Sequence, residues 1–197
     1  MTPKQEERII LKIKKIKAEL AADKKRWGGF YDDSRGLRYL PPELYIKLAD
    51  YSGGMRYMNW FKKNFSDDGG FPEFLFEWAI ILFKVGKVKE AEQIVFKAFC
   101  SNTYILDKFF DNPITPIDKY ESSNIDIPEY AIESFNYSFK QANLIDFAEW
   151  LKYFIETEKF ISLSQRYIDI HKKLKVEHER EIRHTLIDEA DELVNEL

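Results

Sequence analysis

The stretch from Pro72 to Phe99 constrains the fold more than any other part of this chain. Its apolar residues recur at intervals of three and four positions on both sides of Gly86, and that spacing is typical of helices with one buried face. Proline is favoured in the first turn of a helix, and glycine just beyond the end of one. The stretch therefore predicts a helical hairpin, with helices over residues 72–85 and 88–99 and a turn at Gly86.

The rest of the chain carries the same helical periodicity, and we find no strictly alternating run that would predict a strand. Besides the hairpin, we expect helices over residues 3–26, 42–51, 54–65, 128–143, 146–156, 159–174 and 176–197. A chain of 197 residues that is 45% hydrophobic can form one core and is short for two. The predicted fold class is all-α, with about nine helices in a single domain over residues 1–197.

The hairpin resembles a tetratricopeptide repeat. Members of that family have small residues where the two helices cross and a glycine at the turn. The matching residues here are Trp78, Ala79, Gly86, Ala91 and Ala98. The resemblance implies a short stack of helical hairpins over 42–156, with an irregular insertion near 107–127. An N-terminal amphipathic helix and aromatic loop over 1–41 and amphipathic C-terminal helices over 157–197 would flank this stack.

A similar apolar spacing recurs before and after this repeat, which covers residues 72–105. Upstream, Tyr57, Phe61 and Phe65 align with Ala91, Val95 and Phe99, at the family's period of about 34 residues. Downstream the register returns further along, where Ala79 aligns with Phe135 and Ala91 aligns with Phe147. We therefore expect a degenerate unit on either side, the third one with phenylalanine where the family has small residues.

The resemblance also implies a binding surface, because members of the family bind ligands along the concave face formed by the first helix of each hairpin. In the best repeat that face comprises Glu73, Phe76, Ile80, Phe83 and Lys84. The corresponding residues of the third unit are Glu129, Ile132, Asn136, Phe139 and Lys140. Most of these residues are apolar, so we do not expect the carboxylate clamp of chaperone-binding members. The groove either takes an apolar peptide or helix or is filled by the protein's own flanking segments.

The aromatic loop between residues 27 and 42 is a second candidate surface. It contains Tyr31, Arg35, Arg38 and Tyr39, and arginine and tyrosine are favoured in the hot spots of protein interfaces. The alternative is that these residues pack the end of the helical stack, because aromatic side chains bury a large apolar area.

One C-terminal cluster suggests metal chemistry. Glu181 and His184 share a helix face, with Glu177 one turn before them, which is the spacing that di-iron helix bundles use. Such a site needs a second Glu-x-x-His pair, and the sequence has none. We therefore predict no metal and no cofactor, and keep a small helical metal-dependent enzyme using Glu177, Glu181 and His184 as an alternative.

Composition narrows the classes of partner and the location. A net charge of -4 with 32% charged residues disfavours nucleic-acid binding. The longest apolar run, residues 78–83, is too short to cross a membrane. The single cysteine, Cys100, follows an apolar helical run, which favours a packed structural residue over a reactive thiol. With no secretory leader pattern at the start, we expect a cytoplasmic protein.

The two ends of the chain carry opposite charge. Residues 3–26 hold nine basic and four acidic side chains, whereas residues 176–197 hold two basic and eight acidic ones. Both segments also have an apolar stripe that must be buried for the helix to be stable. We therefore expect the terminal helices to pack against each other, within one chain or across a homodimer.

These observations favour a non-catalytic module that binds a protein or peptide of unknown identity through a helical groove. A narrower alternative is a dedicated inhibitor or immunity-type partner of a single protein.

Overall fold

The computed structural model describes residues 1–197 and contains ten α-helices and no strand. The predicted all-α fold class is therefore confirmed. The α-helices are α1 (Pro3–Arg26), α2 (Pro41–Lys47), α3 (Tyr51–Asn64), α4 (Pro72–Lys84), α5 (Val88–Ser101), α6 (Ile105–Phe109), α7 (Pro128–Ser134), α8 (Ile145–Ile155), α9 (Glu158–Val176) and α10 (Arg180–Leu193). Two single-turn 3-10 helices, η1 (Leu37–Tyr39) and η2 (Ala142–Leu144), precede α2 and α8.

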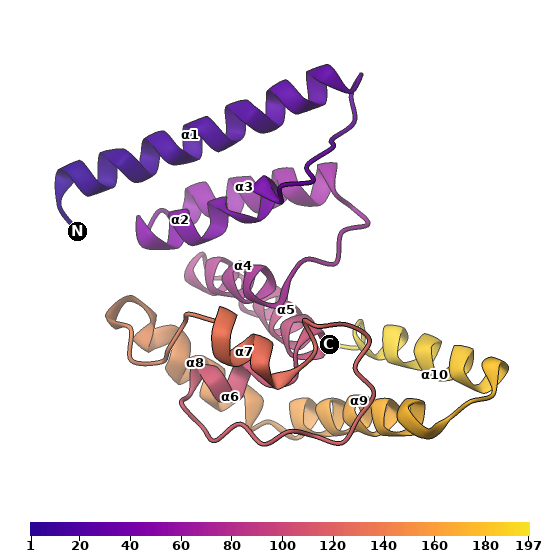
Figure 1. Ribbon diagram of the computed structural model, residues 1–197. Helices are drawn as coiled ribbons and strands as arrows, with labels where there is room; N and C mark the ends of the chain where they lie inside the picture. The colour runs from indigo at the N-terminus through magenta and orange to yellow at the C-terminus, as the bar shows by residue number, and fades with distance from the viewer.

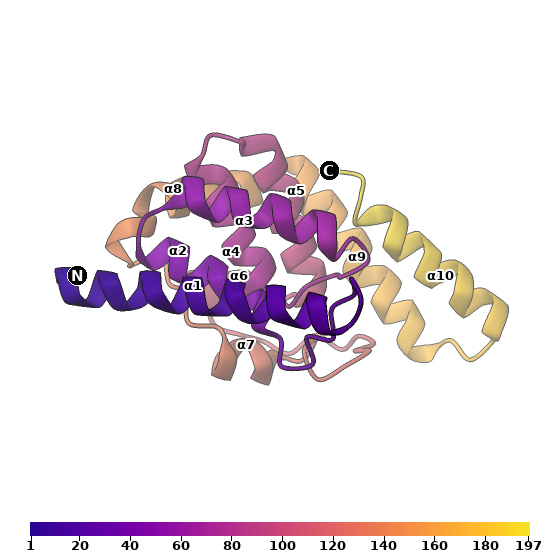
Figure 2. The ribbon, with the colours of Figure 1, turned by 90° about the horizontal axis from the view of Figure 1, so that it is seen from above.

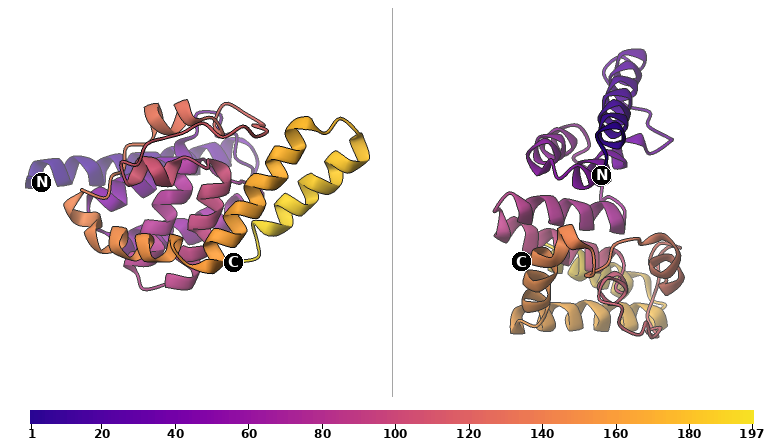
Figure 3. Two further views of the ribbon diagram at one scale, coloured as in Figure 1. Left: turned by 90° about the horizontal axis from the view of Figure 1, so that it is seen from below. Right: turned by 90° about the vertical axis from the view of Figure 1, so that its left-hand side faces the viewer.

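The helices are stacked in layers (Figure 1). α1 lies across α2 and η1 at one end of the molecule, the α4–α5 pair forms the middle, and α6, α7 and α8 lie beyond it. α9 packs against α5 and α8, and the α9–α10 hairpin projects from the side of the body (Figure 3). A single cluster of buried apolar side chains extends from Ile13 in α1 to Leu193 in α10, so one core joins these layers.

α4 and α5 form the hairpin that the sequence predicts. Gly86 ends α4 with a φ of +80°, a left-handed conformation that glycine adopts without steric cost. The N–H groups of Gly86 and Lys87 donate to carbonyl oxygens in the last turn of α4, which is a common way to end a helix. Ala79, Ala91 and Ala98 are completely buried, so the small residues lie where the two helices pack closely.

The predicted helix over residues 128–143 is wrong. α7 ends at Ser134, Phe135 is extended, and no helix forms again until η2. From Ser134 to Phe139 polar and aromatic residues alternate, and a period of two suits an extended segment that buries one side. Phe135 is accordingly buried and Asn136 exposed. The third hairpin unit does not exist in the expected form, because its first helix is only seven residues long.

Residues 110–127 contain no helix, and α6 occupies the start of the predicted irregular insertion. Hydrogen bonds fix this segment across the ends of α5 and α9. The side-chain amide of Asn102 donates to the carbonyl oxygens of Ile125 at 2.7 Å and Ile127 at 3.1 Å. The N–H of Tyr120 donates to the carbonyl oxygen of His171 at 2.9 Å. The insertion is therefore an ordered strap over the helices.

The terminal helices do not meet within the chain, contrary to expectation. α1 contacts α2 and η1, whereas α10 contacts α9, and the two helices lie at different ends of the molecule (Figure 2). The stripe of α1 is buried through Ile13, Ile16 and Leu20, and that of α10 through Leu186 and Leu193. Each stripe is therefore covered by an element near it in sequence. None of the helices combines the length and the apolar character that crossing a membrane requires.

Candidate functional site

The centre of the predicted groove is part of the core. Phe76 and Ile80 have no exposed surface. The Phe76 ring is surrounded by aromatic rings at centroid distances of 4.9 to 5.8 Å, which belong to Phe109, Phe135, Tyr137 and Phe147. This face of α4 is therefore filled rather than open. The filling residues come from α6, α8 and the segment between α7 and η2, and not from the flanking N- and C-terminal segments that the sequence suggested.

The other predicted residues of α4 mark the two ends of this filled face. Half-buried Phe83 stacks on Trp150 with ring centroids 4.8 Å apart. Lys84 pairs with Asp146 at the start of α8. At the opposite end of α4, the Tyr130 hydroxyl donates to Glu73 Oε2 at 2.8 Å. These contacts attach α4 to α7 and α8.

The five predicted residues of the third unit do not form one face. Glu129 and Ile132 are exposed on α7, whereas Asn136 and Lys140 are exposed on the non-helical segment that follows. Phe139 is half-buried and lines a separate cavity of about 580 Å³ beside α8. The predicted face required one continuous helix. Because α7 ends at Ser134, the five residues lie on two different segments.

The predicted loop surface is mainly a structural network. The Arg38 guanidinium donates to the Asp68 carboxylate at 2.7 Å and to the Asp33 carboxylate at 3.3 Å. It also donates to the Tyr39 hydroxyl at 2.8 Å, which in turn donates to Asp68 at 2.7 Å. Arg38 and Tyr39 therefore fasten the loop to the turn between α3 and α4, which is the packing alternative.

Charge and burial in this network shift the pKa values of Asp68 and Tyr39 in opposite directions. Burial opposes ionisation of Asp68, but hydrogen bonds from Tyr39 and Arg38 outweigh it and leave the pKa of the carboxyl below its ordinary value. Burial and the hydrogen bond to Asp68 raise the pKa of Tyr39 to about 12.

Tyr31 packs its ring against Trp60 and Phe65.

Arg35 differs from the other three loop residues because its side chain is 70% exposed, with one ion pair to Glu19 at 3.0 Å. Of the predicted loop surface, Arg35 alone thus presents most of its side chain to solvent.

The C-terminal metal candidates do not converge. Glu181 and His184 are exposed on α10. The Glu177 carboxylate accepts hydrogen bonds from the backbone N–H groups of His178 and Glu179 at 2.8 Å, which lowers the pKa of Glu177. Nowhere do three histidine, cysteine, aspartate or glutamate side chains lie close enough together to hold a metal ion.

Cys100 is half-buried and packs against the core. Burial raises the pKa of its thiol above the ordinary value, which disfavours the reactive thiolate.

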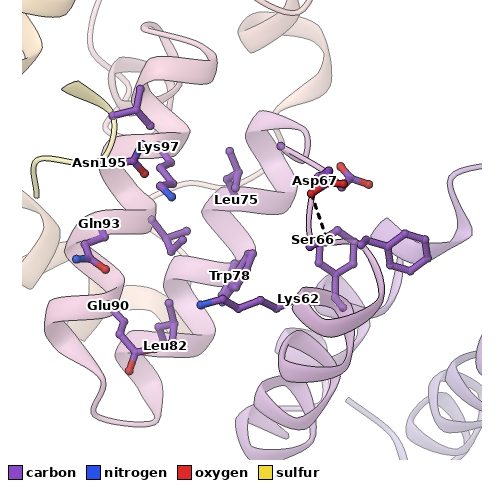
Figure 4. Close-up of a pocket in the computed structure, with 16 residues that line it drawn as sticks. Lys62, Ser66, Asp67, Leu75, Trp78, Leu82, Glu90, Gln93, Lys97 and Asn195 are labelled. Carbon is purple, nitrogen blue, oxygen red and sulfur yellow. Dashed lines mark hydrogen bonds between the residues drawn. The ribbon is translucent and has the colours of Figure 1, made fainter. Parts of the chain in front are cut away.

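A cavity that the sequence did not predict lies between α3, α4 and α5 (Figure 4), and the residues that α4 contributes to it do not include Phe76 or Ile80. It has a volume of about 620 Å³ and is built from the end of α3, the turn before α4, the facing sides of α4 and α5, and the C-terminal tail. We call it the Trp78 pocket. Its apolar lining comprises Phe61, Phe65, Leu75, Trp78, Leu82, Ile94 and Val194.

Trp78 is the chemically distinctive residue of this pocket. Its ring is half-buried and lies edge-on to Phe61 and Phe74, with centroids 6.2 Å from each. The indole Nε1 is buried and has no hydrogen-bond acceptor. Because an indole N–H can only donate, its burial without an acceptor is unfavourable. The indole N–H of Trp78 therefore has no acceptor within the protein, and an oxygen atom of a bound molecule could serve as one.

The rim of the Trp78 pocket carries both signs of charge. Lys62 and Lys97 contribute amines, and Asp67 and Glu90 contribute carboxylates. Figure 4 shows the Lys62 side chain beside Trp78. An apolar floor with a mixed polar rim suits a surface that has both apolar and hydrogen-bonding groups.

The sequence contained only part of the signal for this pocket. Leu75, Trp78 and Leu82 share a helix face by their spacing, but the resemblance gave Trp78 a packing role in the hairpin. The turn at residues 65–69 and the tail at Val194 and Asn195 complete the pocket. Nothing in a single sequence brings segments so far apart together.

Comparisons of the chain with protein-family models, with characterised proteins and with solved structures gave no match. The resemblance to tetratricopeptide repeats therefore depends on the motif residues and on the packed hairpins alone.

Proposed function

We propose that this protein is a non-catalytic binding module whose partner is a protein or peptide that docks on the Trp78 pocket. The observation that carries the proposal is the buried, unpaired indole N–H of Trp78 beside a cavity that is lined by both apolar and polar side chains. A peptide offers what this site lacks, since each residue brings a carbonyl oxygen and its side chains bring apolar surface. The site replaces the concave groove as the candidate interface.

The anatomy of the Trp78 pocket supports a protein partner. Interfaces commonly have an apolar centre and a polar rim, and tryptophan is among the residues most enriched at their energetic hot spots. The indole nitrogen is covered in the free protein. A partner's oxygen would reach it after a covering side chain moves, and the long, flexible Lys62 lies beside it (Figure 4).

Three finer statements belong to the same proposal. The α4–α5 pair would be a tetratricopeptide-like repeat and the α2–α3 pair a degenerate unit of the same kind, and the single cysteine favours a cytoplasmic location. A dedicated inhibitor or immunity-type protein, with one partner only, is the narrower form of this function. If the protein formed a homodimer through its terminal helices, the residues of α4 and α5 that line the Trp78 pocket would remain accessible to a partner.

The test is capture of a partner from the native cell, followed by affinity measurement with the purified partner. Trp78→Ala should weaken binding at least about tenfold, the scale of a hot-spot residue. Lys97→Glu should also weaken it while leaving the core intact. The matched control is Trp27→Ala, which removes an exposed tryptophan from the N-terminal loop.

Circular dichroism and thermal melting must show that each variant is folded. A partner that binds Trp78→Ala, Lys97→Glu and the wild-type protein with equal affinity would refute the proposal.

A further inference from the structure

A second cavity, on another side of α4, contains carboxylates. Glu73 and Glu77 are one helical turn apart and share a side of the helix. Together with Glu43 of α2 they line a cavity of about 260 Å³. We call it the acidic pocket. Its remaining lining residues are Tyr39, Leu40, Phe71, Phe74 and Tyr130.

The acidic pocket opens to solvent beside two apolar residues and Glu43, whose side chain is 43% exposed. Leu40 is 40% exposed and Phe71 is 42% exposed, so both form the rim. Glu77, by contrast, is only 5% exposed and lies at the inner end. A small cavity with apolar residues and Glu43 toward solvent and with the buried Glu77 inside can hold the end of a slender side chain.

The two inner carboxylates are only half satisfied. The Tyr137 hydroxyl donates to Glu77 Oε1 at 2.8 Å, and Glu77 Oε2 has no partner. The Tyr130 hydroxyl donates to Glu73 Oε2, whereas Glu73 Oε1 is buried and has no partner. An ionised carboxylate accepts several hydrogen bonds, so one free oxygen on each residue leaves room for a donor that the chain does not supply.

Neither Glu73 nor Glu77 forms an ion pair with a basic side chain of the chain. Lys47 favours the ionised form of Glu77 through its charge, but it forms its ion pair with Glu43. Burying a carboxylate without a positive partner is costly. Accordingly, burial raises the pKa of Glu77 well above its ordinary value of 4.5, and burial also raises the pKa of Glu73.

We propose that the acidic pocket binds an organic cation, an ammonium or guanidinium group, which is supplied by a lysine or arginine side chain of the protein partner. The assignment to a partner rests on the proposed function, but the affinity of the pocket for an organic cation does not. The two unpaired oxygens would accept N–H donors, and charge-assisted hydrogen bonds of this kind are among the strong ones in proteins.

The walls favour an organic cation over a metal ion. Four of the lining residues are aromatic, namely Tyr39, Phe71, Phe74 and Tyr130, and aromatic faces attract ammonium and guanidinium groups. The carboxylates do not come close enough together to form a metal site. The volume lies below the range of drug-sized sites, about 300 to 1,000 Å³, and suits one side-chain end.

The test uses n-butylammonium and n-butylguanidinium, which reproduce the ends of lysine and arginine side chains, with n-butanol as the uncharged control. Isothermal titration calorimetry should detect saturable binding of the cations and none of butanol. Glu77→Gln should weaken binding about 10-fold to 100-fold, because a neutral amide replaces a charged acceptor. Glu73→Gln should act in the same direction, and Glu129→Gln, at an exposed carboxylate, should change nothing.

A second readout follows from the protonation of Glu77. Binding of a cation favours the carboxylate, so it should release a proton. Titrations in two buffers of different ionisation enthalpy should therefore give different apparent heats for the wild-type protein. They should agree more closely for Glu77→Gln, which has no proton to release at this position.

Competition decides the source of the cation. A short arginine-containing peptide from the captured partner should displace butylguanidinium, and replacing that arginine with alanine should abolish displacement. Displacement by putrescine but by no such peptide would overturn the assignment to a partner. Failure of both cations to bind, equal binding by Glu77→Gln, or binding of Mg²⁺ in their place would overturn the pocket itself. Trp78→Ala should still bind butylguanidinium, so the two proposals fail separately.

Discussion

The sides of α4 differ in how completely their polar and apolar groups are satisfied. Toward α6 and α8, Phe76 and Ile80 are fully enclosed by the protein's own side chains. On the other sides, Trp78 and Glu73 border cavities, and each has a buried polar atom without a hydrogen-bond partner. One helix therefore combines a side that stabilises the fold with sides whose polar groups the chain itself leaves partly without hydrogen-bond partners.

The largest expected effect belongs to the enclosed side. Phe76→Ala should lower the free energy of unfolding by about 3–5 kcal/mol, because it removes a ring that contacts four others and leaves a cavity. Chemical denaturation measures this change. A loss of less than about 1 kcal/mol would mean that this side is loosely packed and accessible, and would remove the contrast.

Ala91 on α5 tests the same packing by the opposite change. It is completely buried, and Ala91→Leu should cost about 1–3 kcal/mol by overpacking the hairpin. Thermal melting measures the effect. An unchanged melting temperature would indicate spare volume between α4 and α5.

Substitution of Glu77 should raise stability, in contrast to the substitutions of Phe76 and Ala91. Its raised pKa means that the folded state binds more protons than the unfolded state between pH 4.5 and the raised value. The stability of the wild-type protein should therefore fall as pH rises through that window. Glu77→Gln keeps an acceptor for the Tyr137 hydroxyl and removes the charge, so its stability relative to wild type should increase over the same window.

The groups that face Glu77 are Tyr137, Glu73, Glu43 and Lys47. Because all are present in both proteins, the difference between the two pH profiles isolates Glu77. Parallel profiles from chemical denaturation at several pH values would show that the carboxyl is not desolvated.

Trp78→Phe should have the smallest effect on stability. It keeps an aromatic ring and removes an N–H that has no acceptor, so the free energy of unfolding should change by at most about 1.5 kcal/mol. Affinity for the captured partner should nevertheless fall. Loss of stability without loss of affinity would show that Trp78 stabilises the fold, as Phe76 does, and does not contact the partner.

The parts of the fold that follow local rules were predictable. Gly86 and the buried alanines identified the α4–α5 hairpin, and Pro128 correctly marked the start of α7. The alternation from Ser134 to Phe139 indicates an extended segment, but it directly follows a helical pattern that begins at Pro128, and the two patterns compete. Periodicity describes which side of an element is apolar, but it does not say which other element covers that side.

The candidate sites were less predictable for the same reason. Glu77 was not singled out, since a glutamate within an apolar helix gives no sign that Tyr137 will be its only hydrogen-bond donor. The Trp78 pocket requires the C-terminal tail, and the acidic pocket requires Glu43 from α2. Both sites depend on tertiary contacts between segments that share no local pattern.

The central claim is tested most directly by the indole N–H signals in a nitrogen-15 NMR spectrum. The chain has four tryptophans, and the signal of Trp78 is identified by its loss in Trp78→Phe. When the captured partner is added, this signal should shift downfield as the N–H gains an acceptor, while that of Trp150 at the enclosed side stays in place. A partner that binds without moving the Trp78 signal would contradict the account.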